Sequence, residues 1–541
     1  MNGQMMDMPL LMSSLLVHAE RYHRDTEIVS RTIEGPIHRY TYADAALRAR
    51  KAAQALQRLG LRPGERAATL AWNGYRHFEL YYGISGIGAV MHTLNPRLHP
   101  DQVVWIANHA EDQVLFFDLT FAPLVEAVAA RCKTVKHWVA MTDRAHMPAL
   151  KGVNALCYED LIGAESGELE WPQLDERSAL CLCYTSGTTG NPKGVLYSHR
   201  SMMLHTFAAP LPDMMNLSGS DVILPVVPMF HVNAWCIPYI GAMIGAKLVF
   251  PGARLDGESL CELFESEQVT FSAGVPTVWL GMLQHLQKGN KAPSALKRMV
   301  VGGSACPPAL METFERDYGI QMLHCWGMTE MSPMGTVGSL KGKFLKLPRE
   351  QQFKVALKQG RPPFGVDMKI VDAKGAELPR DGKSSGELLV RGPWIIDTYY
   401  KVDKSPLVDG WFPTGDVANI DPDGYLQITD RSKDVIKSGG EWISSIDVEN
   451  VAMAHPAVAM AAVIAVPHPK WDERPLLVVV KKPGAEIGRD DMLKFFDGKI
   501  AKWWTPDDVV FVEALPLGAT GKVQKNVLRE QLGDHKLPAT G

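Results

Sequence analysis

A loop at residues 184–194 combines the groups that proteins use to hold the phosphates of a nucleotide. It follows an apolar segment, Ala179–Tyr184, that predicts a short buried strand. Its glycines would let backbone N–H groups approach an anion closely, its hydroxyls would donate further hydrogen bonds, and Lys193 would add positive charge. The candidate residues are Thr185, Ser186, Gly187, Thr188, Thr189 and Lys193. The loop lacks the Gly-Lys-Ser/Thr ending of a Walker A motif, and the alternative interpretation is a flexible Ser/Gly linker.

Two further segments carry groups suited to the rest of a nucleotide and its magnesium ion. The indole of Trp326 could stack on a purine, and Thr329 and Glu330 offer the hard oxygen atoms that Mg²⁺ prefers. Taken alone, a Thr-Glu pair could simply begin a helix. Further along the chain, Asp416 could accept hydrogen bonds from both hydroxyls of a ribose, and Arg431 could reinforce that contact.

Two segments near the C-terminus contain glycine beside polar residues. Gly439 and Gly440 would give the backbone the freedom to line a narrow channel, although a simple turn would use the same residues. Lys522 follows a glycine and precedes a predicted helix, Asn526–Leu532. An extended ammonium group there could hold a substrate carboxylate against a phosphate and offset the charge that develops during the reaction. The alternative is a solvated lysine.

Taken in order along the chain, these segments resemble the signature motifs of the adenylate-forming superfamily, which includes acyl-CoA synthetases, firefly-type luciferases and the adenylation domains of peptide synthetases. The resemblance covers nearly all of the sequence. It implies an α/β fold with a large N-terminal domain of parallel-rich sheets flanked by helices and a small, mobile α+β C-terminal domain. We expect the domains to span residues 1–432 and 433–541, with a hinge at Lys433; a surface lysine in a turn is the alternative.

The resemblance also implies roles for individual residues. Besides the loop, those that match nucleotide contacts of the superfamily are Gly302, Gly303, Ser304, His324, Trp326, Gly327, Met328, Thr329, Asp416, Arg431 and Lys437. Those that match the magnesium site are Thr185 and Glu330. Those that match catalytic positions are Lys522, His231 and Glu330. Those that match the coenzyme A channel are Gly439, Gly440, Glu441 and Trp442.

The segment from residue 222 to residue 246 contains no Asp, Glu, Lys or Arg. Within it, the run around His231 and Trp235 resembles a segment of fatty acyl-CoA synthetases in which the tryptophan gates entry of the acyl chain and the histidine borders the carboxylate. Pro333 is the third expected acyl contact. A histidine among apolar residues is more often an ordinary core residue. Because amino-acid-activating relatives use an aspartate here, an uncharged acyl tail is favoured.

The motifs together imply two half-reactions at one site. A carboxylate would attack the α-phosphorus of ATP to give an acyl-adenylate and pyrophosphate, with Mg²⁺ as cofactor. The small domain would then rotate, withdraw Lys522 and present the glycine-rich segment. The thiolate of coenzyme A would attack the acyl carbon and release AMP.

The acyl substrate is suggested by segments outside these motifs. At Trp72–Asn73 and Leu94–Arg97 the chain looks most like medium-chain fatty acid and 3-methylmercaptopropionate CoA ligases. We favour 3-methylmercaptopropionate, with a medium- or long-chain fatty acid as the alternative. A regulator that binds acyl groups and nucleotides without turnover is a different class of explanation, and the presence of both Lys522 and Glu330 argues against it.

Apolar periodicity predicts the elements that position these groups. Residues 42–59 form an amphipathic pattern capped by Thr41 and ended by Gly60, which predicts a helix. Alternation of helix and strand patterns predicts parallel sheets covered by helices. The other expected strands are Arg66–Trp72, Gln113–Asp118, Arg298–Val301, Val458–Val466, Pro475–Lys481 and Asp508–Glu513, and a further helix is expected at Arg489–Lys502.

Composition restricts the class of protein. A chain of 541 residues is long enough for two or more domains, and a net charge of −4 without a long basic run argues against nucleic acid as a partner. Eight scattered cysteines predict reduced thiols and a cytoplasmic protein, and the N-terminus lacks the basic start of a secretion signal. Residues 222–246 could span a membrane by length, but Pro225, Pro228 and Pro238 would interrupt the helix. Related enzymes often form homodimers, which we expect here.

Overall fold

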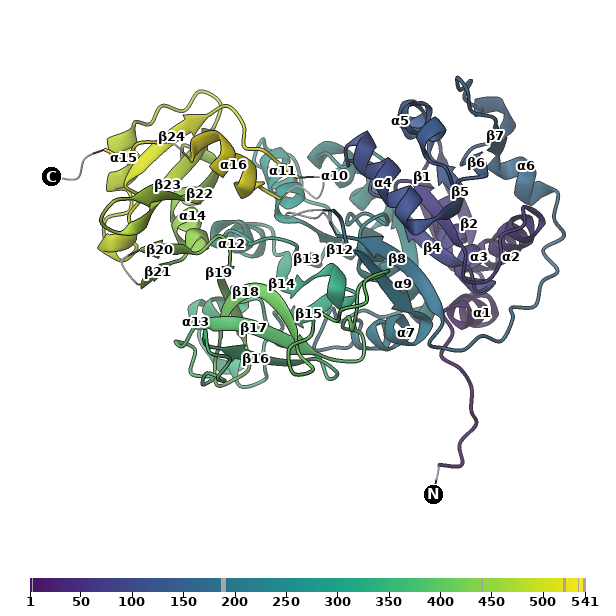
Figure 1. The fold of residues 1–541 in the computed structure, drawn as a ribbon, viewed down its shortest axis with the longest axis horizontal. Helices are drawn as coiled ribbons and strands as arrows, with labels where there is room; N and C mark the ends of the chain where they lie inside the picture. The colour runs from purple at the N-terminus through teal and green to yellow at the C-terminus, as the bar shows by residue number, and fades with distance from the viewer. Residues whose placement is uncertain (2, 186–190, 439–440, 519–521, 534, 539–541) are drawn as a thin grey trace.

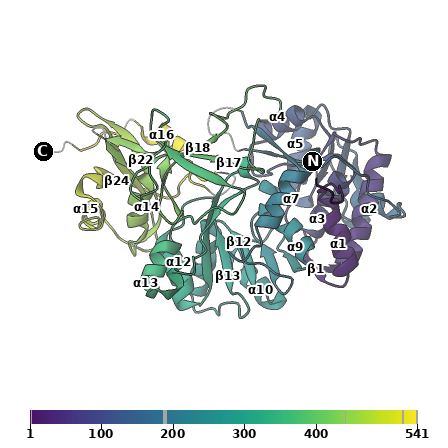
Figure 2. The same cartoon turned by 90° about the horizontal axis from the view of Figure 1, so that it is seen from below.

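The computed structural model describes residues 1, 3–185, 191–438, 441–518, 522–533 and 535–538. Within these residues the strands form four sheets, of seven, eight, four and five strands. Figure 1 and Figure 2 place the five-stranded C-terminal sheet at one end of the molecule and α1 (Ser13–Tyr22) at the other. This arrangement confirms the predicted α/β fold with a separate C-terminal domain.

The seven-stranded sheet has the order β7-β6-β5-β3-β4-β8-β9 and is parallel except for its last pair. Its strands are β3 (Arg66–Leu70), β4 (Val90–Thr93), β5 (Asp112–Phe117), β6 (His137–Ala140), β7 (Ala155–Cys157), β8 (Ala179–Tyr184) and β9 (Gly194–Ser198). The helices that precede or connect them are α2 (Tyr42–Arg58), α3 (Tyr75–Gly86), α4 (Pro100–Ala110), α5 (Ala122–Val128) and α6 (Tyr158–Gly163). The candidate phosphate loop therefore joins β8 to β9.

The eight-stranded sheet has the order β15-β14-β13-β12-β10-β11-β1-β2 and is parallel except at its two edges. Its strands are β1 (Glu27–Arg31), β2 (Ile37–Thr41), β10 (Val222–Pro225), β11 (Lys247–Phe250), β12 (Phe271–Gly274), β13 (Arg298–Val301), β14 (Gln321–Gly327) and β15 (Met334–Val337). The helices of this region are α7 (His199–Ala208), α8 (Val232–Trp235), α9 (Ile237–Ile244), α10 (Gly257–Glu267), α11 (Pro276–Leu286), α12 (Pro308–Asp317) and α13 (Arg349–Ala356). One apolar core joins both large sheets and includes Phe78, Tyr239 and Phe250.

The two smaller sheets follow in sequence. The four-stranded antiparallel sheet contains β16 (Asp367–Val371), β17 (Gly386–Arg391), β18 (Phe412–Ile420) and β19 (Leu426–Arg431). The C-terminal sheet contains β20 (Ile436–Ser438), β21 (Glu441–Ile443), β22 (Val458–His468), β23 (Asp472–Lys481) and β24 (Asp508–Val512), with helices α14 (Ser445–Met453), α15 (Arg489–Lys494) and α16 (Lys525–Leu532). Separate apolar clusters lie on this sheet, around Val463 and around Ile464, so the C-terminal domain has its own core.

The predicted elements are largely confirmed, with one clear error. Thr41 caps α2 by accepting a hydrogen bond from the backbone of Asp44, as the sequence pattern predicts. The helix expected at 489–502 is wrong, because α15 ends at Lys494. Gly498 adopts a φ of 72°, which a right-handed helix cannot accommodate, and the chain turns there instead.

The uncharged segment at 222–246 lies in the protein interior, as expected. It contributes β10, α8 and α9, and most of its apolar side chains are buried. Among the residues that the structure describes, none of the helices has the length and apolar run needed to cross a bilayer.

Candidate active site

Asp416 contacts two other residues that are predicted to bind the nucleotide. Trp326, near the end of β14, donates a hydrogen bond from Nε1 to Asp416 Oδ2 at 2.8 Å, across 90 residues of sequence. Arg431 lies directly opposite Asp416 in the β18–β19 pair, and its Nε is 3.0 Å from Asp416 Oδ1. Asp416 is buried whereas Arg431 is exposed. The groups proposed for the purine and the ribose thus meet at one carboxylate.

Glu330 occupies a short 3-10 helix, Thr329–Met331, directly after β14. The hydroxyl of Tyr399 donates to Glu330 Oε1 at 2.8 Å, and both side chains are buried. The Nζ atom of Lys193 lies 4.8 Å from the centre of the Tyr399 ring. The phosphate-loop lysine and the candidate metal-binding carboxylate therefore contact the same aromatic side chain.

Lys522 reaches this site from the C-terminal domain. Its Cε atom is 4.0 Å from the position that a Cβ atom on Gly303 would occupy. Burial and, to a smaller extent, the charge of Arg431 lower the pKa of Lys522 to about 8, although Asp416 and Glu330 act in the opposite direction. The Lys522 residue as a whole is half-buried in terms of exposed surface area. The loss of water that lowers its pKa therefore concerns the ammonium group. The structure therefore brings Lys522 to the same cleft as the nucleotide candidates.

His231 is close enough to Lys522 for the lysine charge to act on it, and Trp235 lies against Gly302. Burial lowers the pKa of His231 to about 4, and the charges of Lys522 and Arg97 lower it as well. A ring with this pKa is neutral near pH 7 and can donate or accept a hydrogen bond. The Trp235 ring lies 3.2 Å from the position of a Cβ atom on Gly302, so the absence of a side chain at Gly302 leaves the indole its place.

The backbone that carries Trp235 is strained. Residues 232–236 have φ values of 46°, 53°, 48°, 55° and 64°, so α8 is a left-handed turn without glycine. This conformation costs roughly 1–2 kcal/mol per residue. Asn233 is anchored because its Oδ1 accepts from the thiols of Cys181, at 3.2 Å, and Cys183, at 3.6 Å. Strain of this kind gathers at functional sites, and the gating role expected for Trp235 stays a prediction.

Gly327 permits a close approach between β14 and the segment after Glu330. A Cβ atom at this position would collide with the backbone carbonyl oxygen of Pro333, which the Met328 backbone N–H also contacts at 3.0 Å. Gly327, expected as a nucleotide contact, thus lets the two backbones lie side by side in this structure. Pro333, an expected acyl contact, is buried at this crossing.

We predict that Gly327→Ala lowers the free energy of unfolding by about 1–3 kcal/mol, because the added methyl group overpacks the crossing. It should also weaken ATP binding, since Trp326 and Glu330 lie on either side. Gly342→Ala is the matched control, because a Cβ atom there meets nothing within 4 Å. Thermal unfolding and nucleotide titration measure both effects. Equal behaviour of the two variants would contradict this prediction.

The structure shows fewer contacts between the remaining predicted residues and the rest of the site. The ring of His324 is buried and donates from Nδ1 to the carbonyl oxygen of Leu357 at 2.9 Å, which ties it to a neighbouring segment. Ser304 is exposed, and the exposed Lys437 lies on β20. Thr185 begins the loop and bonds with Lys193 through its backbone. Ser186, Gly187, Thr188, Thr189, Gly439 and Gly440 lie outside the described residues, and of Glu441 and Trp442 only the strand β21 is described.

Tyr399 and Tyr197 also belong to this site, although no sequence motif indicates them. Tyr197 donates to the carbonyl oxygen of Thr329 at 2.6 Å, and Tyr399 holds Glu330. Tyr197 lies on β9, the strand that leaves the phosphate loop, so its position beside the motif is the one signal that could have suggested it. Tyr399 is 69 residues from its partner, and no local spacing reveals that contact.

The comparisons with known proteins agree with this geometry. The family model described as "AMP-binding enzyme" matches residues 15–400, and "AMP-binding enzyme C-terminal domain" matches residues 447–522. The chain belongs to the AMP-binding enzyme family. The resemblance found in the sequence motifs is thereby confirmed.

Relatives of this AMP-binding enzyme match along almost its entire length. It is 55% identical to a 3-methylmercaptopropionyl-CoA ligase of Ruegeria lacuscaerulensis, covering 99% of both chains. It is 50% identical to a medium-chain-fatty-acid–CoA ligase of Ectopseudomonas oleovorans, covering 99% of this chain and 98% of that one. Among solved structures, an anthranilate CoA ligase in complex with anthranoyl-AMP superposes with a TM-score of 0.86 at 25% identity, covering 97% of this chain and 98% of that one.

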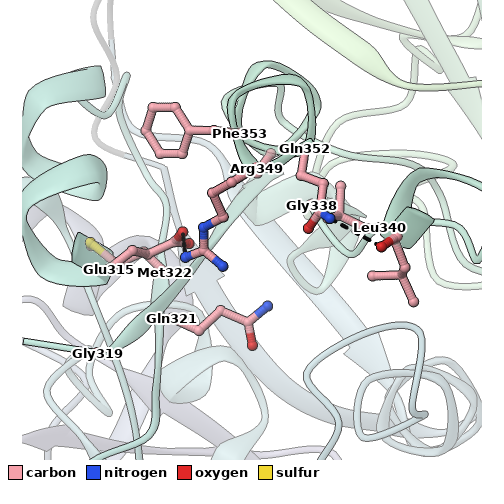
Figure 3. A pocket seen from close by; sticks show the side chains of 11 residues that line it. Glu315, Gly319, Gln321, Met322, Gly338, Leu340, Arg349, Gln352 and Phe353 are labelled. Atoms are coloured by element: carbon pink, nitrogen blue, oxygen red, sulfur yellow. Dashed lines mark hydrogen bonds and ion pairs between the residues drawn. The ribbon is translucent and has the colours of Figure 1, made fainter. Parts of the chain in front are cut away.

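A cavity of about 460 Å³ lies outside the candidate site of this AMP-binding enzyme. The ion pair between Glu315 and Arg349, at 2.9 Å, lies on its wall together with Gln321 and Phe353 (Figure 3). The cavity adjoins the beginning of β14, whereas Trp326 is near its end, roughly 15 Å along the strand. It therefore does not belong to the nucleotide cleft.

Proposed function

We propose that this AMP-binding enzyme is an ATP-dependent, AMP-forming acyl-CoA ligase that acts on 3-methylmercaptopropionate or a similar short- to medium-chain acid. The observation that carries the proposal is the position of Lys522 beside Gly303, close enough to Glu330 and Asp416 for their charges to act on it. The names of the relatives at 50–55% identity support the reaction and the substrate class. A medium- or long-chain fatty acid is the second candidate substrate.

In the first half-reaction the residues of the large domain would position ATP. Trp326 would face the purine, and Asp416 would exchange its present contacts for the ribose hydroxyls. Glu330 and Thr185 would hold Mg²⁺, which neutralises phosphate charge when bound. One buried carboxylate fits this role, because Mg²⁺ is commonly bound by one or two carboxylates together with substrate phosphates. Lys522 would bridge the substrate carboxylate and the α-phosphate.

The acyl carboxylate would enter beside His231, with its tail directed past Trp235. A neutral imidazole can orient a carboxylate by donating one hydrogen bond without forming a competing ion pair. Neither side chain adds a formal charge where the tail would lie, which suits an alkyl or thioether chain.

In the second half-reaction the C-terminal domain would rotate about Lys433 and bring residues 439–442 to the cleft for coenzyme A. Asp430, before the proposed hinge, accepts hydrogen bonds from the backbone of Ser445 at 2.6 Å and from its hydroxyl at 3.0 Å. These bonds cross from β19 to α14, so the rotation must break them or carry Asp430 along. We place the domains at residues 1–432 and 433–541.

A comparison of AMP formation with 3-methylmercaptopropionate and with straight-chain acids from C4 to C10 tests the substrate assignment. We expect the thioether acid to have the highest kcat/KM. A preference for longer acids would favour the fatty-acid alternative, and reaction with aromatic or amino acids alone would contradict the proposal. A protein that only binds these ligands would release no pyrophosphate. We further propose a cytoplasmic homodimer, and light scattering of the purified protein tests the dimer.

The pH dependence of adenylation follows from Lys522. In the free enzyme the pKa of Lys522 is about 8. Its side chain therefore carries a positive charge below that pH and loses the charge above it. We predict that kcat/KM for ATP falls by about tenfold per pH unit on the alkaline side of this pKa. In Lys522→Arg the guanidinium stays charged, so whatever activity remains should lack this alkaline fall. A flat profile up to pH 10 in the unmodified enzyme would contradict the assignment.

A further inference from the structure

The segment at residues 394–400 contacts both the turn that carries Glu330 and the end of the phosphate loop. At one end, the backbone N–H of Ile396 donates to the carbonyl oxygen of Glu330 at 2.8 Å. At the other end, the backbone N–H of Tyr400 donates to the carbonyl oxygen of Gly194 at 2.8 Å. The segment is therefore fixed both to the turn that carries Glu330 and to the end of the phosphate loop.

Tyr399 lies between these two attachments and contacts both sides through its side chain. Its hydroxyl donates to Glu330 Oε1, and its ring faces the ammonium group of Lys193. A carboxylate oxygen can only accept, so the phenol hydroxyl of Tyr399 is the donor in this bond. Tyr399 is 8% exposed, which leaves its ring little freedom to turn away.

We propose that Tyr399 is a positioning residue that orients the Glu330 carboxylate for Mg²⁺·ATP and links it to Lys193. This inference rests on the proposed function, because it takes Glu330 as the metal-binding carboxylate. A carboxylate has two oxygens, so one can accept from Tyr399 while the other serves the metal. Hydrogen bonds of this kind fix the direction of a ligand, and their loss commonly costs about 10- to 100-fold in metal affinity.

The geometry also separates this role from ordinary packing. The ring of Tyr399 fills its site and contacts Lys193, and the hydroxyl alone reaches Glu330. Tyr399→Phe removes the hydroxyl and retains the ring. A purely structural role would therefore survive this substitution, whereas the positioning role would not.

The test is calorimetric titration of ATP into the full-length protein with and without Mg²⁺, in the absence of any acid. We expect Tyr399→Phe to reduce the gain in ATP affinity that Mg²⁺ provides by about tenfold. Affinity without Mg²⁺ should stay within about twofold of that of the unmodified protein, since the ring contact with Lys193 persists. Tyr400→Phe is the matched control, because the ring of Tyr400 lies against His109 and Lys401.

An unchanged Mg²⁺-dependent gain in Tyr399→Phe would overturn the proposal, and so would an equal loss of affinity with and without Mg²⁺. Because the titration contains no acid, its result does not depend on the acyl substrate. If the unmodified protein binds Mg²⁺·ATP but activates no acid, the proposed function fails while the role of Tyr399 can still be measured. If Glu330→Gln leaves the gain from Mg²⁺ intact, Glu330 is not the metal ligand and both assignments fall.

Discussion

Lys522→Ala is expected to lower the rate of acyl-adenylate formation by about 100- to 1,000-fold, which is the usual loss when one preorganised charge is removed from a transition state. The ammonium group of Lys522 is the C-terminal domain's contribution to the cleft that contains Glu330 and Asp416. Alanine removes it without leaving a buried charge, so the fold should persist. Pyrophosphate release in a single turnover measures this step.

The same variant should form the thioester from a supplied acyl-adenylate and coenzyme A at nearly the unmodified rate. The reason is that Lys522 leaves the cleft in the proposed second half-reaction. Lys536→Ala, which removes an exposed lysine near the C-terminus, is the matched control and should leave both steps unchanged. Equal loss of both half-reactions in Lys522→Ala would contradict the proposed domain rotation.

Asp416→Ala should have the next largest effect, a loss of about 100- to 1,000-fold in kcat/KM for ATP. A carboxylate that accepts from both ribose hydroxyls makes two charge-assisted hydrogen bonds, each worth about 1.5–3 kcal/mol. Part of this is offset in the free protein, where Asp416 already pairs with Trp326 and Arg431. The lower end of the range is therefore the better expectation.

The effect of Asp416→Ala should depend on the ribose. 2′-Deoxy-ATP should lose affinity in the unmodified enzyme, whereas Asp416→Ala should discriminate little between ATP and 2′-deoxy-ATP. Asp403→Ala, which removes an exposed carboxylate from the preceding loop, is the matched control. Retained discrimination between the two nucleotides in Asp416→Ala would place the ribose elsewhere.

Local motifs in the sequence indicated residues that the structure brings together from distant parts of the chain. Trp326, Asp416 and Arg431 were each suggested by residue type and order, and the structure places them in contact across three strands. The same holds for Lys522, whose Cε atom lies 4.0 Å from the position of a Cβ atom on Gly303. Each residue could be predicted because its own short motif carries the chemistry, wherever it lies on its strand: Trp326 and Arg431 are near strand ends, whereas Asp416 is in the middle of β18.

Contacts between distant segments could not be predicted in the same way. Tyr399 contacts Glu330 because residues 394–400 run beside the turn after β14. The sequence of neither segment indicates that they are neighbours or how they are aligned. The left-handed turn at 232–236 could not be predicted from the sequence either, because none of its residues is glycine, the residue that most often adopts positive φ. Its conformation depends on buried partners such as Cys181, which come from another strand.

The prediction of secondary structure was wrong for one helix, and the cause is local. The apolar spacing of residues 489–502 suits a helix, but the positive φ of Gly498 outweighs it. The expected coenzyme A contacts at 439–442 and much of the phosphate loop remain predictions.

The most direct test of the account is exchange of labelled pyrophosphate into ATP without coenzyme A. Exchange requires that an acyl-adenylate forms reversibly at the site where the charges of Glu330 and Asp416 act on Lys522. We predict exchange that depends on Mg²⁺ and on 3-methylmercaptopropionate and that is lost in Lys522→Ala. Absence of acid-dependent exchange in a protein that binds ATP, or exchange that persists in Lys522→Ala, would contradict the account.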